Sequence, residues 1–470
     1  MKKSVLYILS YGLLLSGGGC RKFSEVSPPS TSLAAATVYG SNATASAAVT
    51  GIYFSMSTNS VGGGTHGITA LLGLSADEFN LYSNATDMLI SQAYVNALLS
   101  TNAPSMWNDL YNIIYQANSA IEGILNSQGV SADMKNQLIG ESEFIRAFCY
   151  FYLVNLYGNV PLVLTTNYQE NQTISRDPQQ QVYQQMISDL LDAKGKLSNN
   201  YLSYNGSVST VRIRPNSAAA TALLARVYLY TDSLSNAVKA ANEVIGNSAF
   251  ILDSNLNNVF VSTSQEAIWQ LQAPYPGSNT PDGGVFLINM FGGPSGFYPY
   301  LLADPIVFGF EPGDLRRVNW IDSMVVGGST YYFPYKYKLY YTGQPATEYA
   351  TLLRLGEQYL IRAEAKAEAG DLNGATSDLN AVRKRAGLGM TSATTQQQIL
   401  AAIMRERRFE LFTEYGHRWL DLKRTGQVDS VMNLVTPTKG GSWASTAQWY
   451  PIPILDIETD PKMQQNQGYQ

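Results

Sequence analysis

Aromatic side chains that could stack on a ligand crowd into residues 249–348, where glycine and proline are frequent and helical periodicity disappears. They include Trp269, Tyr275, Phe297, Tyr298, Tyr300, Trp320, Tyr331, Tyr332, Phe333, Tyr335, Tyr337, Tyr340 and Tyr341. Such rings stack on apolar ligand faces, and the polar tips of Tyr and Trp form hydrogen bonds. Loops on a rigid scaffold often carry binding residues. The pattern predicts a loop-rich binding lobe with a few short strands, such as 267–272 and 330–335.

Catalytic chemistry has less support in the same region. Asp304, Glu311 and Asp314 could provide the two facing carboxylates of a glycoside hydrolase, but nothing in the sequence fixes their separation. His66 and His417 belong to no recognisable nucleophile constellation. We therefore assign no catalytic residue and expect a protein that is not an enzyme, with a glycoside hydrolase kept as the less favoured alternative.

The composition favours a neutral ligand. The net charge is −5, and charged residues are 14% of the chain, against about 25% in typical proteins. Asn, Gln, Ser and Thr must supply the polar surface, and together with 31 tyrosines they suit neutral ligands such as sugars. No electrostatic feature favours nucleic acid. With two histidines and two cysteines in the chain, we expect no metal and no cofactor. Cys149 lies in an apolar helical run and is interpreted as a small buried hydrophobe.

Charged and apolar residues alternate at helical spacing in the stretch 399–426, which contains no proline. Arg405 and Arg408 lie on a row that later turns aromatic and apolar, so both are expected on the core face. A buried guanidinium must be paired and hydrogen-bonded. Glu410 and Glu414, further along the same stretch, are the expected partners. We interpret this stretch as structural.

Helical patterns dominate the rest of the chain. Helices are predicted over 107–125, 131–157, 178–197 and 215–230, and Gly416 is expected to break the helix of 399–426. A repeat is also visible: Ala225, Leu234, Ala237, Ala241 and Val244 recur as Ala363, Leu372, Ala375, Leu379 and Val382. Small residues at this spacing let paired helices approach closely, as in tetratricopeptide hairpins. The predicted fold is mostly α, with tetratricopeptide-like hairpins forming a scaffold for the loop-rich lobe.

The N-terminus has the features of an export signal. Lys2 and Lys3 precede an apolar run over 5–15, which is too short to span a bilayer comfortably. Small residues then lead to Cys20, the expected lipidation site of a lipoprotein signal. Three glycines stand directly before Cys20, so the usual leucine three positions upstream is missing. A plain secretory signal peptide remains the alternative.

Several motifs together resemble one family. They are RERRFELFTEYGHRWLDL at 405–422, RAFCYFYLVNLYGNVPL at 146–162, the set Trp107, Tyr111, Ile114, Asn118 and Ile121, the segments 314–317 and 336–337, WYPIP at 449–453, and QNQGY at 465–469. In this order they resemble the SusD/RagB family, surface nutrient-binding lipoproteins of Bacteroidetes-type bacteria. The resemblance extends from Cys20 to Tyr469.

The resemblance implies a division of the chain. Residues 1–19 would be a lipoprotein signal peptide, 20–30 a tether, 31–248 an N-terminal SusD-like helical region, 249–348 the variable aromatic lobe, and 349–470 the C-terminal SusD/RagB helical region and tail, with 250–470 together forming the RagB/SusD-type part.

The resemblance also implies a function: a non-catalytic, palmitate-bearing lipoprotein of the outer membrane that binds an oligomeric nutrient, most simply a glycan. It would hand this ligand to a SusC-like TonB-dependent outer-membrane transporter. Sugars present apolar ring faces and a hydroxyl rim, which aromatic rings and amides match. The candidate ligand contacts are Tyr82, Asn84, Tyr275, Tyr298, Tyr300 and Trp320. A helical scaffold that binds peptide or protein partners through its hairpins is the other alternative.

Overall fold

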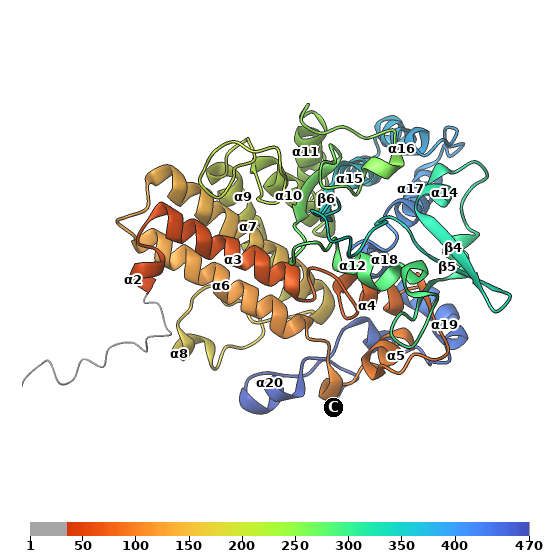
Figure 1. The fold of residues 1–470 in the computed structure, drawn as a ribbon, viewed down its shortest axis with the longest axis horizontal. Coiled ribbons are helices and arrows are strands. Elements are labelled where there is room, and N and C mark those ends of the chain that lie inside the picture. Colours follow the sequence, from red (N-terminus) through yellow and green to blue (C-terminus); the bar gives the residue numbers. More distant parts are fainter. Residues whose placement is uncertain (1–34, 470) are drawn as a thin grey trace, which may run out of the picture.

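The computed structural model of the protein describes residues 35–469. The expectations for residues 1–30, including lipidation of Cys20, lie outside this range. Within it the protein is mostly helical, with a few short strands, as predicted. Figure 1 shows long helices of the N-terminal half packed side by side, with most of the C-terminal helices and a β-hairpin on the other side of the molecule.

The N-terminal half is organised around α7. This helix, Ala132–Tyr157, packs between α6 (Met106–Asn126) and α9 (Gln179–Lys196), and α3 (Asn42–Thr58) packs against α6 and α7. Most of α7 is buried on every side, as expected for a helix in the middle of a core. Cys149 is fully buried there, as predicted. Within residues 35–469, no helix is long and apolar enough to cross a membrane.

Shorter elements complete this half. They are α2 (Ala35–Val38), α4 (Ile68–Ser75), β1 (Phe79–Leu81), α5 (Met88–Tyr94), η2 (Ser100–Asn102) and α8 (Tyr168–Asn171).

Two helical hairpins confirm the repeat. The first is α10 (Ser217–Tyr230) with α11 (Leu234–Ile245), and the second is α15 (Leu355–Glu368) with α16 (Leu372–Arg385). They lie far apart in the sequence, yet α11 packs directly on α15 through a cluster that contains Ala237, Ala241 and Ala365. Small side chains at this contact let the helix axes approach, so the two hairpins form one continuous stack.

The lobe between the hairpins contains short strands and single-turn helices. Its elements are η3 (Leu256–Asn258), β2 (Ala267–Leu271), α12 (Pro281–Phe286), η4 (Ile288–Phe291), β3 (Tyr300–Leu302), α13 (Asp304–Val307), α14 (Leu315–Asn319), β4 (Ile321–Val326), β5 (Ser329–Pro334) and β6 (Ala350–Arg354). The strands pair antiparallel as β1–β3, β2–β6 and β4–β5. The strands predicted over 267–272 and 330–335 are confirmed as β2 and β5.

The C-terminal helices are α17 (Gln396–Glu410), α18 (His417–Arg424), α19 (Val428–Thr438) and α20 (Ile454–Thr459), with η5 (Ser445–Gln448). The predicted break occurs between α17 and α18, where Gly416 adopts φ +72°. A Cβ at this position would lie 2.1 Å from the Leu72 side chain. Glycine is therefore required both by the left-handed backbone and by the close packing on α4.

A candidate ligand face and the charge network behind it

Five aromatic residues of the lobe and its border form what we call the ring face: Tyr82, Phe291, Tyr298, Tyr331 and Tyr340. The rings of Phe291 and Tyr298 stack in parallel, with centroids 3.9 Å apart. Tyr82 packs edge-on against Tyr331 at 5.8 Å, and Tyr340 lies 6.4 Å from Phe291. Among residues 35–469, no protein group bonds to the four phenol hydroxyls of the ring face. The rings therefore hold each other, while their polar tips are free for water or a ligand.

The pairing of β1 with β3 brings together three of the predicted ligand contacts, Tyr82, Asn84 and Tyr298. The Tyr82 N–H donates to the Pro299 carbonyl at 2.8 Å, which places Tyr82 beside the segment that carries Tyr298. A Cβ at Gly296 would lie 2.8 Å from the Asn84 carbonyl oxygen, so this segment also packs on the Asn84 backbone. The Asn84 side chain is exposed. Residues far apart in the sequence thus share one surface.

A polar edge borders the same surface. His66 Nε2 lies 2.8 Å from the Asp87 carboxylate, three residues after Asn84. Burial would raise the pKa of Asp87, but the Ile90 N–H and His66 hold it below its ordinary value. The sequence interpretation missed this pair, because its two members come from separate segments that only the fold brings together.

Two predicted contacts, Tyr300 and Trp320, are fully buried. Tyr300 is enclosed by Phe79 and Phe286, and its hydroxyl donates to the Thr65 carbonyl. The Trp320 indole N–H donates to the Leu256 carbonyl at 3.1 Å. An enclosed ring has no face left for a ligand, so we omit both residues from the proposed site.

Tyr275 is exposed, in a segment that runs beside the residues around Tyr340. The Asn279 N–H donates to the Tyr340 carbonyl at 2.7 Å, and Ser278 forms an antiparallel bridge with Tyr341.

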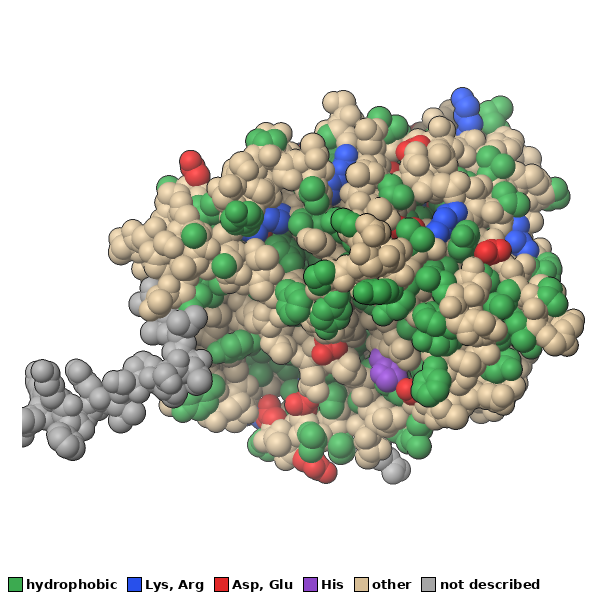
Figure 2. Space-filling model, viewed as in Figure 1, with side chains coloured by type: hydrophobic (Ala, Val, Ile, Leu, Met, Phe, Trp, Pro, Cys, Tyr) green, Lys and Arg blue, Asp and Glu red, His purple; other side chains and the backbone are tan. Residues whose placement is uncertain are grey.

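Figure 2 shows hydrophobic side chains gathered over the middle of the face that it displays, where α12 and the end of α3 lie in Figure 1, and again to the right, over β5. Charged side chains are sparse between them.

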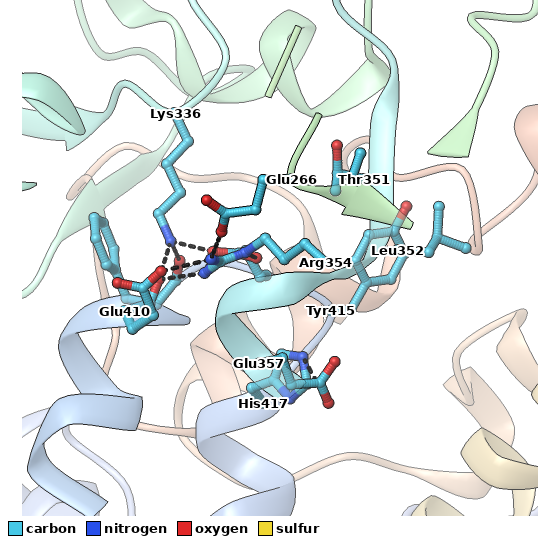
Figure 3. A network of polar contacts seen from close by, with 12 residues as sticks. Glu266, Lys336, Thr351, Leu352, Arg354, Glu357, Glu410, Tyr415 and His417 are labelled. Carbon is cyan, nitrogen blue, oxygen red and sulfur yellow. Dashed lines mark hydrogen bonds and ion pairs between the residues drawn. The ribbon is translucent and has the colours of Figure 1, made fainter. Parts of the chain in front are cut away.

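Behind the lobe lies a group of buried charges centred on Glu410, which we call the charge network. Figure 3 shows Lys336 and Arg354 reaching toward Glu410, with the Glu266 carboxylate directed at Arg354. Arg354, at the junction of β6 and α15, bonds to Glu266 at 2.9 Å and to the Glu410 carboxylate. Arg316 and Arg385 bond to the same carboxylate. Burial would raise the pKa of Glu410, but Arg385, Arg354 and Arg316 together hold it well below its ordinary value.

Lys336 connects the end of β5 to the chain between α17 and α18. Its ammonium group donates to the carbonyls of Glu410 at 2.9 Å and Phe412 at 2.7 Å, and it pairs with Glu414. Burial lowers the pKa of Lys336 to about 8, although Glu414 opposes the shift. Arg354 also bonds to Glu414, at 2.7 Å. The lobe, β6 and the C-terminal helices are thus fastened at one point.

The predicted core-face position is wrong for Arg405, and the predicted glutamate partners are wrong for both Arg405 and Arg408. Arg405 is half exposed and donates to the Gly309 carbonyl, whereas Arg407 is buried and pairs with Asp421 at 2.8 Å. Arg408 bonds to Asp77 rather than to a glutamate of its own helix. The helix α17 ends at Glu410, so the helical row of residues that was predicted to continue past Gly416 is interrupted. The carboxylates nearest to Arg405 and Arg408, those of Glu311 and Asp77, come from distant segments of the chain.

The carboxylates considered for hydrolysis are used in other ways. Asp314 bonds to Arg316 at 2.7 Å, Glu311 pairs with Arg383 at 2.7 Å, and Asp304 is exposed in α13. Burial, followed by the nearby Arg226, lowers the pKa of His417 well below its ordinary value, which keeps the imidazole neutral. No group of three or more His, Cys, Asp or Glu residues suited to a metal ion occurs within residues 35–469.

Comparison with known families assigns this architecture. Residues 36–229 match a family described as starch-binding and associating with the outer membrane, and residues 318–469 match the SusD family. The chain belongs to the SusD/RagB family. The SusD-like protein P25 of Formosa agariphila is 25% identical and aligns with 97% of this chain and 98% of its own length. The starch-binding protein SusD of Bacteroides thetaiotaomicron is 39% identical over 124 residues, which are 25% of this chain and 21% of that protein.

Solved structures show the same SusD-type fold. A laminarin-binding SusD-like protein superposes with a TM-score of 0.77 at 26% identity, covering 92% of this chain and all of the other. Surface glycan-binding protein A from Bacteroides fluxus superposes with a TM-score of 0.74 at 21% identity, covering 91% of this chain and 99% of the other. This SusD-family chain therefore has the fold that those two glycan-binding proteins use.

Proposed function

We propose that this SusD-family chain is a non-catalytic glycan-binding lipoprotein of the outer membrane. In this proposal the lipid is attached at Cys20, residues 249–348 form the ligand lobe, and residues 31–248 and 349–470 form its scaffold. The bound oligosaccharide passes to a SusC-like TonB-dependent transporter.

The observation that carries the proposal is the parallel stack of Phe291 and Tyr298 beside Tyr82 and Asn84. A sugar ring presents a flat apolar face of C–H groups, which suits an exposed aromatic platform. Its hydroxyls can bond to the Asn84 amide and to the free phenol hydroxyls. The ring face is built mainly from neutral side chains, so a neutral glycan is the ligand class that it fits.

The alternatives have weaker structural support. Hydrolysis would require two facing carboxylates, whereas Asp314 and Glu311 are held by different arginines. A scaffold that binds peptides or proteins remains compatible with the stacked hairpins. It would leave the free phenol hydroxyls of the ring face without a role.

The experiment is a binding panel on the mature protein. Affinity electrophoresis through gels containing laminarin, amylopectin, xylan or mannan should retard the protein in at least one gel, and a reducing-end assay of that polysaccharide should show no product. The transporter should co-purify from detergent-solubilised outer membranes. Retardation in none of the gels, with the transporter still bound, would favour the scaffold. New reducing ends would favour a hydrolase.

A further inference from the structure

A second concave surface is lined in part by the start of the segment 272–279. It is a pocket of about 580 Å³ between α3, the segment 202–214 and the end of β2. Phe54, Tyr204, Tyr349 and Pro274 contribute apolar walls, and Gln272 adds an amide. Its volume lies within the range of small-molecule sites, so it can accept one or more sugar units.

The pocket is electrically neutral. Arg214 is its one charged lining residue, and that guanidinium is already bound. Its Nε and Nη2 lie 3.1 and 2.9 Å from the two carboxylate oxygens of Glu141, and its Nη1 donates to the Thr50 hydroxyl at 3.0 Å. Because Glu141 balances the charge of Arg214, the pocket attracts neither an anion nor a cation.

Three of its polar groups have no protein partner. The Tyr204 and Tyr349 hydroxyls and the Gln272 side-chain amide make no hydrogen bond within residues 35–469. Tyr204 is 69% exposed and Phe54 is 53% exposed, so ring surface and free donors and acceptors occur together. A neutral, polyhydroxylated ligand with apolar faces satisfies both, whereas an apolar peptide side chain would use the rings alone.

The pocket is joined to the ring face by a short segment. Pro274 lines the pocket, and five residues later Asn279 bonds to the Tyr340 carbonyl at 2.7 Å. Five residues span at most about 17 Å. Tyr275 and Tyr341, both well exposed, lie on the intervening segments. One oligosaccharide chain is long enough to bridge this distance.

We propose that this pocket is a second binding station for neutral sugar units, so that the protein holds a glycan polymer at two points. The proposal rests on the proposed function, because it assumes that the ring face binds a glycan. Two linked stations raise the affinity for a polymer above that for a short oligomer, since binding at the second station is intramolecular.

The test compares the double variant Tyr204→Ala/Gln272→Ala with the parent. Both side chains are exposed and without hydrogen-bond partners, so their removal should leave the fold intact. The matched control is Tyr168→Ala on α8, because Tyr168 is 71% exposed and is not one of the residues that line the pocket. The probes are the polysaccharide that retards the parent and a disaccharide prepared from it, which is too short to occupy both stations at once, for example laminarin and laminaribiose.

Calorimetry of the parent with the disaccharide should give two sites per chain. The double variant should give one site and should bind the polymer roughly ten-fold more weakly, as expected for the loss of one of two linked sites. Tyr168→Ala should behave like the parent. One site in the parent, or unchanged stoichiometry in the double variant, would overturn the second station but leave the proposed function standing. A parent that binds no member of the panel would overturn both.

Discussion

The charge network and the ring face lie in the same half of the molecule, but their side chains differ in what they are free to do. In the charge network, Glu410 and Arg354 are buried, and each is held by several partners. In the ring face, the phenol hydroxyls of Tyr82 and Tyr298 have no partner within residues 35–469. The first arrangement fixes backbone positions, and the second leaves groups available to a ligand.

The two regions are mechanically connected. Lys336 lies two residues after β5, which carries Tyr331 of the ring face, and Lys336 is held by the carbonyls of Glu410 and Phe412. Arg316, on α14 just before β4, bonds to Glu410. The charge network thus positions the hairpin that supports the ring face. Changes in the network should affect stability first, and changes in the ring face should affect binding alone.

The largest effect is expected for Glu410→Ala. Removing this carboxylate takes one partner from each of the buried guanidinium groups of Arg316, Arg354 and Arg385, although each keeps another carboxylate. Breaking buried ion pairs in this way costs about 3–5 kcal/mol of unfolding free energy. Denaturant unfolding followed by circular dichroism measures the loss. The control is Glu243→Ala, whose partner Lys194 is on the surface, with an expected change below about 1 kcal/mol. Equal effects of the two variants would contradict the proposed fixing role.

A smaller effect is expected from pH at Glu78, which is buried beside the network and accepts the Thr413 N–H. Burial raises the pKa of Glu78 to about 7, from 4.5. A raised carboxyl pKa gives stability that is fully present below pH 4.5 and is lost as pH rises through 7. Between pH 5 and 8 the parent should therefore lose about 2 kcal/mol more than Glu78→Gln does.

Urea titrations of both proteins at the two pH values measure this difference. Glu143 and Glu348, whose pKa values burial also raises to about 7, are present in both proteins and cancel in the comparison. Parallel pH dependences of parent and variant would show that Glu78 is ionised in the folded protein across this range.

At the ring face, Tyr298→Ala should weaken glycan binding about five-fold, because one ring of the stack with Phe291 is lost and aromatic stacking contributes about 1 kcal/mol. Tyr298→Phe keeps the ring and should retain most of the affinity. Calorimetry with the polysaccharide found in the panel measures both. If Tyr298→Phe weakens binding as much as Tyr298→Ala does, the hydroxyl of Tyr298 rather than its aromatic ring makes the contact with the glycan.

The smallest effect is expected for Asn84→Ala. This exposed amide has no protein partner within residues 35–469, so its loss removes at most a hydrogen bond to ligand, about 0.5–1 kcal/mol. Affinity should fall a few-fold at unchanged unfolding free energy. A fall in stability instead would place Asn84 among the residues that fix the structure.

The helices and hairpins could be predicted because their signal is local. The spacing of apolar residues predicted α6, α7 and both repeats, and a glycine marked the break between α17 and α18. The partners of the charged side chains could not be predicted in this way. Asp77 binds Arg408 and Arg418 from more than 300 positions away, which no local spacing reveals.

The ring face shows the same limit. Sequence pattern identified the aromatic lobe but could not tell inward rings from outward ones, because the lobe has no regular periodicity. Tyr298 is part of the surface, whereas Tyr300, two positions later, is enclosed by Phe79 and Phe286. Phe291 was overlooked, although it forms the closest ring stack. Phe291 could be recognised as a partner of Tyr298 only from the folded structure, because the sequence does not reveal how β1 pairs with β3.

The pairing of β2 with β6 places the entrance and the exit of the lobe side by side, with Ala267 opposite Arg354. The direct contact of α11 with α15 closes the helical stack independently of what the chain does between them. Most of the lobe is thus an insertion between two strands that pair with each other. The surface loops between these strands can therefore change in length and composition to suit a different ligand, provided that Arg316 and Lys336 still reach Glu410 and Glu414.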